Sequence, residues 1–132
     1  MRTILVALFA SAFSSIACAQ DAAPASYDGT WAMTAASTDG REFSAELVLK
    51  GDGGTWRNYG RRGGAAMKNN PCLMKEFPVT VQKSTADGLT FRVDGSKVIA
   101  GCNDFTAELK RVDDKTLDGT MGESWTAHLA RK

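Results

Sequence analysis

Apolar and polar residues alternate along most of the chain. The alternation is clearest in REFSAELVLK, residues 41–50, where nearly every second residue is apolar. It recurs near residues 77–81, 89–93, 105–109 and 125–129. A period of two gives each strand one buried face and one wet face, which is typical of an antiparallel sheet.

The dipeptide Asp-Gly occurs six times and divides these segments. Glycine adopts positive φ without strain and Asp can bond to the backbone that follows it, so the pair favours tight turns. The pairs lie at 28–29, 39–40, 52–53, 87–88, 94–95 and 118–119. With these marks we predict nine strands, near residues 29–36, 41–50, 54–59, 77–83, 88–94, 97–101, 104–112, 115–121 and 123–131.

The pattern predicts an all-β fold. Most connections have hairpin length, so strands adjacent in sequence should be adjacent in the sheet. A meander of eight or nine strands in a chain of this size closes most easily into a small antiparallel up-and-down β-barrel, which removes exposed sheet edges. A two-sheet β-sandwich is the alternative.

The first residues have the pattern of a secretory signal peptide. A cationic start is followed by an apolar run and then by Ala17-Cys18-Ala19, with small residues at the cleavage positions. The run is shorter than a membrane-spanning helix requires. We therefore expect a signal peptide at 1–19, a flexible segment at 20–26 and a single β-barrel domain at 27–132. Lipidation of Cys18 would instead anchor the domain to a membrane, as in a lipoprotein of the outer membrane.

Charge excludes one class of partner. The chain carries 16 Lys and Arg against 15 Asp and Glu, a balance that argues against a general nucleic-acid binder. Two cysteines, Cys72 and Cys102, would remain after cleavage, and in an exported chain such a pair is more often oxidised than free. We predict one disulfide bond and a periplasmic or secreted protein.

One resemblance bears on the fold. Gly29-Thr30-Trp31 opens the first predicted strand and Arg131 closes the last, which resembles the Gly-x-Trp and closing Arg pattern of the lipocalin and avidin-like (calycin) superfamily. The resemblance implies that Trp31 lies at the floor of a barrel and that Arg131 packs over its ring, as a cation-π contact. No motif resembles the biotin contacts of avidins, so a biotin site is not implied.

Catalytic and metal-binding patterns are weak. His128 is the only histidine, and no Gly-x-Ser-x-Gly motif accompanies it. Most Asp residues precede Gly in turns, and none has the spacing of a calcium loop. We expect neither an enzyme nor a bound metal or cofactor.

The segment TWRNYGRRGGAAMKNNPC, residues 55–72, is the strongest candidate surface. It combines aromatic and cationic side chains with three glycines and no acid, so the basic loop 57–70 could present a positive patch, or could be a solvated connection. Trp and Arg are also enriched where binding energy concentrates. The candidate contact residues are Trp56, Arg57, Tyr59, Arg61, Arg62 and Lys68.

The main hypothesis is an exported, non-enzymatic binding protein that contacts an anionic envelope component or another protein through this loop. A protein of this kind could be an inhibitor or an immunity-type factor. A small molecule or lipid held inside the barrel is the first alternative, and a structural envelope protein is the second. The large apolar residues are numerous enough to fill a small barrel, so we expect a filled interior and a surface contact.

Overall fold

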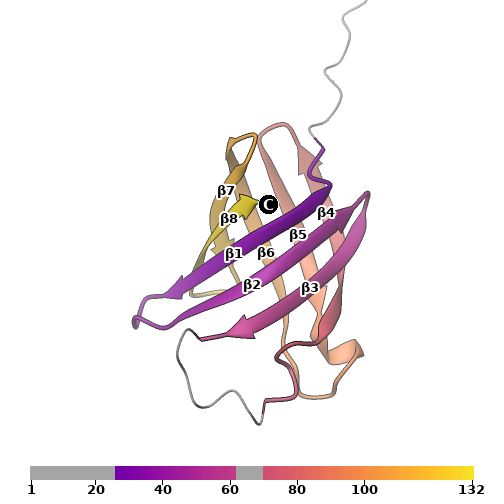
Figure 1. Ribbon diagram of the computed structural model, residues 1–132, viewed down its shortest axis with the longest axis vertical. Coiled ribbons are helices and arrows are strands. Elements are labelled where there is room, and N and C mark those ends of the chain that lie inside the picture. Colours follow the sequence, from indigo (N-terminus) through magenta and orange to yellow (C-terminus); the bar gives the residue numbers. More distant parts are fainter. Residues whose placement is uncertain (1–25, 62–69) are drawn as a thin grey trace, which may run out of the picture.

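A computed structural model of the chain describes residues 26–61 and 70–132. The described chain forms a closed barrel of eight antiparallel strands, and consecutive strands are neighbours throughout (Figure 1). The barrel closes where the first strand pairs with the last, in a register that runs from Trp31 opposite Arg131 to Ser37 opposite Trp125. The predicted up-and-down barrel is confirmed, and the sandwich alternative is excluded. The strands are β1 Gly29–Ser37, β2 Glu42–Lys50, β3 Gly53–Gly60, β4 Glu76–Thr85, β5 Gly88–Asp94, β6 Asp104–Asp113, β7 Thr116–Met121 and β8 Trp125–Arg131.

The strand predicted at 97–101, the sixth of the nine, is wrong. A short 3-10 helix, η2 (Gly95–Lys97), and a turn occupy this part of the chain. Asp94 is only 7% exposed and pairs with Arg92 at 2.8 Å and with Lys97 at 3.6 Å, which turns the backbone at the end of β5. Val98 is then 51% exposed and cannot continue the buried apolar row.

Inward-facing side chains from all eight strands form one core. Alternate residues of β1, β2 and β5 are buried, as the period of two requires. The interior is close-packed over most of its length, and the largest fully buried side chains are Trp31, Trp56, Phe91, Met33, Leu47, Leu89, Leu117, Leu129 and Val93.

Two glycines let adjacent strands approach closely. A Cβ on Gly54 would lie 1.9 Å from the carbonyl oxygen of Val48, and one on Gly119 would lie 2.0 Å from the carbonyl oxygen of Glu108. Gly119 therefore belongs to the interior of β7, and Asp118-Gly119 is not a turn, although the same dipeptide does mark turns at 39–40 and 87–88. Glycines within strands are typical of sites where a sheet bends or coils sharply.

The connections divide between the two ends of the barrel. The β2–β3, β4–β5 and β6–β7 turns lie at the end that also holds residues 26–28 and Lys132, and the remaining connections lie at the other end (Figure 1). No helix in the part of the chain that the structure describes has the length and apolar character needed to cross a membrane. The predicted signal peptide and Cys18 lie outside the described residues.

Candidate functional site

One end of the barrel is closed by its own side chains. The guanidinium of Arg131 lies 4.3 Å from the centroid of the Trp31 ring, and its Nη1 donates a hydrogen bond of 2.5 Å to the carbonyl oxygen of Asp28. The indole Nε1 of Trp31 donates to the carbonyl oxygen of Tyr27 at 2.9 Å. The hydroxyl of Tyr27 donates in turn to the carbonyl oxygen of Thr85 at 2.5 Å, and burial raises the pKa of this hydroxyl. This end is a floor packed around Trp31, with a smaller hollow of about 500 Å³ beside Tyr27 and the β2–β3 turn.

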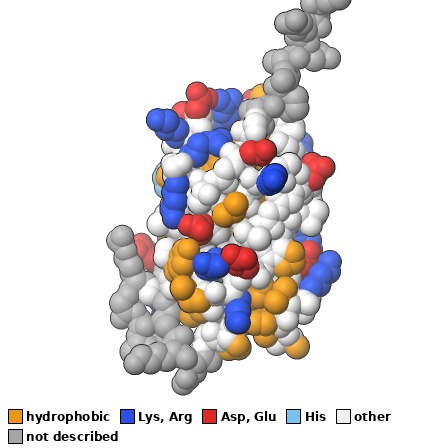
Figure 2. All heavy atoms as spheres, turned by 45° about the vertical axis from the view of Figure 1, so that its right-hand side comes forward, with side chains coloured by type: hydrophobic (Ala, Val, Ile, Leu, Met, Phe, Trp, Pro, Cys, Tyr) orange, Lys and Arg blue, Asp and Glu red, His pale blue; other side chains and the backbone are white. Residues whose placement is uncertain are grey.

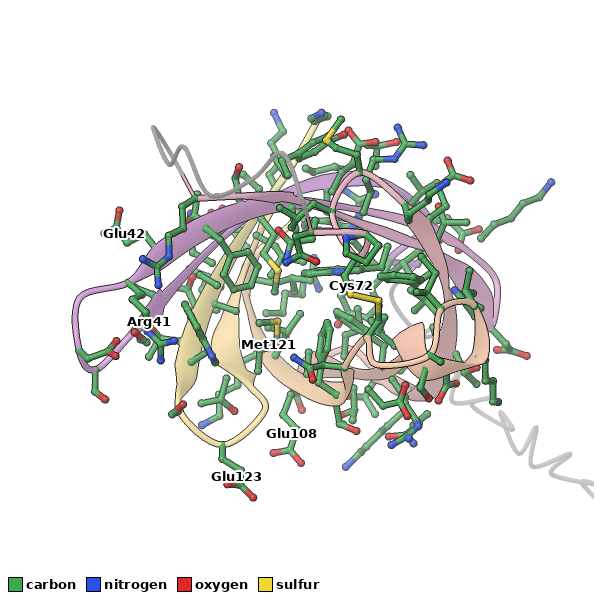
Figure 3. All side chains as sticks on the ribbon, turned by 90° about the horizontal axis from the view of Figure 1, so that it is seen from below. Arg41, Glu42, Cys72, Glu108, Met121 and Glu123 are labelled. Carbon is green, nitrogen blue, oxygen red and sulfur yellow. A yellow bond between two sulfur atoms is a disulfide. The ribbon has the colours of Figure 1, made fainter. Side chains whose placement is uncertain are left out.

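The opposite end holds an open cavity of about 710 Å³. Figure 3 views this end along the barrel, with Cys72 and Met121 directed toward the middle of the opening and Glu123 directed away from it. The lining is rich in aromatic side chains and amides, and consists of Phe43, Trp56, Asn58, Asn70, Cys72, Leu73, Phe77, Gly101, Asn103, Asp104, Phe105, Met121, Gly122, Glu123, Ser124 and Trp125. We call this cavity the mouth.

Aromatic rings from non-adjacent parts of the sequence form two pairs in the mouth. Phe43 and Trp125 meet edge to face with ring centroids 4.9 Å apart, and Trp56 meets Phe105 in the same way at 5.2 Å. Trp56 is buried beneath the mouth, whereas the other three rings are partly exposed. Rings that are already held by neighbours and still reachable offer a ligand a preorganised apolar surface.

A charged cluster supports one side of this wall. The guanidinium of Arg41 lies 5.2 Å from the Trp125 ring centroid and pairs with Asp39 at 2.8 Å. The Ser37 hydroxyl and the Arg41 guanidinium both donate to the Asp39 carboxylate and lower its pKa to about 2. The β1–β2 turn is thereby fastened against the rim of the mouth.

The predicted disulfide between Cys72 and Cys102 is confirmed. It joins the β3–β4 connection to the β5–β6 connection, and Cys72 lines the mouth. The backbone N–H of Met74 also donates to the carbonyl oxygen of Asn58 at 2.8 Å. The described part of the β3–β4 connection is therefore fixed to the barrel at two points.

The expectation of a filled interior holds for the floor but not for the mouth. Phe91, Leu117 and Leu129 leave no exposed surface in the middle of the barrel. At the open end the pairing of β3 with β4 stops at Arg57 opposite Glu76, and Asn58 stands on the inward-facing side of β3, where a large apolar residue would be needed to complete the filling.

The structure separates the residues predicted for the basic loop. Trp56 is only 2% exposed and belongs to the core, and Arg57 extends from β3 to form an ion pair of 2.6 Å with Glu76. Tyr59 is partly exposed in β3, and Arg61 is exposed just after it. Arg62 and Lys68 lie outside the described residues. The interval 57–70 is thus not a single loop, because β3 runs to Gly60.

The outer wall carries no comparable chemistry in the described residues. His128 is exposed and contacts the Asp118 carboxylate through Nδ1, in a hollow of about 650 Å³ across β1, β2, β7 and β8. No group of three potential ligands among the described residues could hold a metal ion. Figure 2 shows acidic and basic side chains interspersed on one face of the wall, with apolar side chains gathered toward its lower part.

Sequence reasoning gave a ligand inside the barrel as an alternative but missed the residues of the mouth, because they are far apart along the chain. One signal was present: Phe43 lies near the start of β2, Phe105 at the start of β6 and Trp125 at the start of β8. In an up-and-down barrel, alternate strands start at the same end. The three rings therefore had to lie at the same end once the barrel closed.

Comparison with known proteins supports the fold alone. Searches found no matching family model and no matching curated protein. The similar solved structures include a redesigned β-barrel, with 17% identity and a TM-score of 0.52 over 80% of this chain and 90% of that chain, and a de novo designed fluorescence-activating β-barrel, with 11% identity and a TM-score of 0.56 over 80% and 94%. Both are artificial barrels.

Proposed function

We propose that this protein is a non-enzymatic binding protein that holds one small, largely apolar molecule in the mouth of its barrel. The observation that carries the proposal is the cavity of about 710 Å³ with partly exposed aromatic rings at its rim. Ligand pockets typically enclose roughly 300–1,000 Å³, and a barrel of about eight strands has room for one small ligand. Export to an oxidising compartment, which we infer together with this function, agrees with the disulfide.

The division into a packed floor and an open mouth supports this function over a purely structural one. The contacts of Trp31 at the floor hold the barrel closed, so the stability of the fold does not require side chains to fill the mouth. The same arrangement is what a calycin-like barrel would have, with its ligand opposite the end that Arg131 closes, and we propose that relationship on the sequence resemblance alone.

A contact between the segment after β3 and an anionic or protein partner remains a second proposal. Arg61 is exposed where this segment leaves the barrel, beside the rim of the mouth. Trp56 and Arg57 do not contribute to such a surface, because the first is buried and the second is paired with Glu76. The partner would therefore be recognised by Tyr59, Arg61 and residues further along the segment.

The proposal can be tested by titrating the protein with an uncharged fluorescent dye, N-phenyl-1-naphthylamine. We expect saturable enhancement of dye emission with a stoichiometry of one. Replacing Trp125 by Ala removes one ring of the rim and should weaken binding about fivefold, since one aromatic contact contributes roughly 0.5–1.5 kcal/mol beyond its buried area.

A matched control is His128→Ala, which changes an exposed aromatic residue of the same strand on the outer wall. This variant should bind the dye like the parent protein. Saturable binding that both substitutions leave unchanged would place the dye elsewhere, and an absence of saturable binding of any apolar probe would refute the proposal.

A further inference from the structure

The geometry points to the class of ligand: a flat aromatic molecule that carries an oxygen acceptor, such as an aryl ketone, quinone or aryl carboxylate, oriented by the side-chain amides of Asn58 and Asn70. This inference rests on the proposed function, because it describes how the mouth would orient its ligand. It goes further in naming the polar group that the ligand must have.

The side-chain oxygen of Asn58 is already used. It accepts a hydrogen bond of 2.6 Å from the backbone N–H of Gly60, and this donor fixes which end of the amide is oxygen. Its Nδ2 group, with two N–H donors, has no hydrogen-bond partner among the described residues, and it is not sealed from solvent. Asn58 lies two residues after Trp56, on the inward-facing side of β3 at the mouth.

Asn70 repeats this arrangement on the β3–β4 connection. Its side-chain oxygen accepts a hydrogen bond of 3.0 Å from the backbone N–H of Cys72, a residue held by the disulfide. Its Nδ2 likewise finds no partner in residues 26–61 and 70–132. Each amide oxygen therefore already accepts one hydrogen bond, neither Nδ2 has a partner among the described residues, and both amides line the same cavity.

Available donors select acceptors on the ligand. A carbonyl or carboxylate oxygen can receive N–H groups from either amide, whereas a ligand group that only donates would leave the amides without a partner after water is displaced. The rings of Phe43, Phe105 and Trp125 require the rest of the ligand to be flat and apolar. The described residues that line the mouth include neither Lys nor Arg, so the side-chain donors there, those of Asn103 and Ser124 included, are uncharged.

Two probes of the same shape test the inference. 2-Acetylnaphthalene and 2-isopropenylnaphthalene differ only in a carbonyl oxygen against a methylene group. The matched variants are Asn58→Asp and Asn70→Asp, in which one carboxylate oxygen still accepts from Gly60 or Cys72 while the other replaces the N–H donors by an acceptor. Calorimetric or competitive dye titration gives the dissociation constants of both probes.

In each variant we expect the affinity for the ketone to fall at least fivefold and the affinity for the hydrocarbon to change less than twofold. A preference for the ketone that neither substitution reduces would overturn the inference while leaving apolar binding in the mouth intact. Binding of neither probe to the parent protein would instead overturn the proposed function and the inference together.

A measurement on the parent protein alone guards against variants that fail to fold. The side-chain NH₂ resonances of Asn58 and Asn70 should shift on addition of the ketone and stay in place on addition of the hydrocarbon at equal saturation. Equal shifts with both probes would contradict orientation by a hydrogen bond.

Discussion

Arg131, the last residue of β8, lies over the ring of Trp31, the third residue of β1, with 4.3 Å between the guanidinium carbon and the ring centroid. The two residues are also directly opposite in the β1–β8 register. The contact therefore closes the barrel and covers its floor at the same position. Arg131 adds hydrogen bonds to the carbonyl oxygens of Asp28 and Ser26, at 2.5 and 3.2 Å.

Arg131→Ala should lower the free energy of unfolding by about 2 kcal/mol, because a charged hydrogen-bond donor and a cation-π contact are lost together. Urea denaturation followed by tryptophan fluorescence measures the change. Arg131→Lys should recover less than half of the loss, since an ammonium group cannot reproduce the planar fork. Lys110→Ala, on the outer wall, is the control and should stay within about 0.5 kcal/mol of the parent protein. Equal effects of Arg131→Ala and Lys110→Ala would show that the floor contact contributes nothing.

Replacing Cys72 and Cys102 together by Ala should cost about 3–4 kcal/mol, because the bridge closes a loop with a sequence separation of 30 in the unfolded chain. The barrel should still close, since its strand pairs do not depend on the bridge. Denaturation of the double variant measures the loss of stability, and far-ultraviolet circular dichroism shows whether the barrel still forms. A cost below about 1 kcal/mol would contradict the chain-entropy argument for this bridge.

Asp39 should titrate with a midpoint near 2 in the folded protein, well below its ordinary value of 3.8. A pKa lowered by folding means that the carboxylate is favoured in the native state. Its stabilising contribution is complete above the unfolded pKa and disappears as the pH falls from about 4 through 2. Carboxyl ¹³C chemical shifts measure the midpoint. Ser37→Ala removes the largest cause of the shift and should raise the midpoint toward 3.8, and a midpoint that does not move would exclude this hydroxyl as the cause.

Gly119→Ala should destabilise the barrel by at least about 2 kcal/mol, a cost in the range known for overpacked interiors. The added Cβ would lie 2.0 Å from the carbonyl oxygen of Glu108 and 2.8 Å from Cα of Leu109, so β6 and β7 must separate. Gly53→Ala is the matched control, because its Cβ would meet its nearest neighbour at an ordinary 3.4 Å. Thermal unfolding should separate the two variants clearly, and equal melting temperatures would contradict the close approach at Gly119.

Local sequence patterns were enough to predict most of the fold but little of the candidate site. Alternation along 41–50 reports which side chains face inward, and hairpin-length connections restrict the order of the strands, so the barrel was predictable. The segment 97–101 was not, because its backbone is turned by the Asp94 ion pairs, which form only when β5 and its flanking residues are folded. The mouth depends on where the pairing of β3 with β4 stops and on the hydrogen bonds that the oxygens of Asn58 and Asn70 accept, and a pattern of single residues encodes neither feature.

Pairing of β1 with β8 also imposes an order on folding. The seven residues of β8 must pair with β1, which lies about a hundred residues earlier in the chain. Such long-range contacts slow folding. Until Trp125–Arg131 arrives, β1 and β7 each present an open edge to other chains. A chain shortened before β8 should therefore accumulate as aggregates rather than as a looser monomer, and its rate of aggregation should rise with concentration where that of the full chain does not.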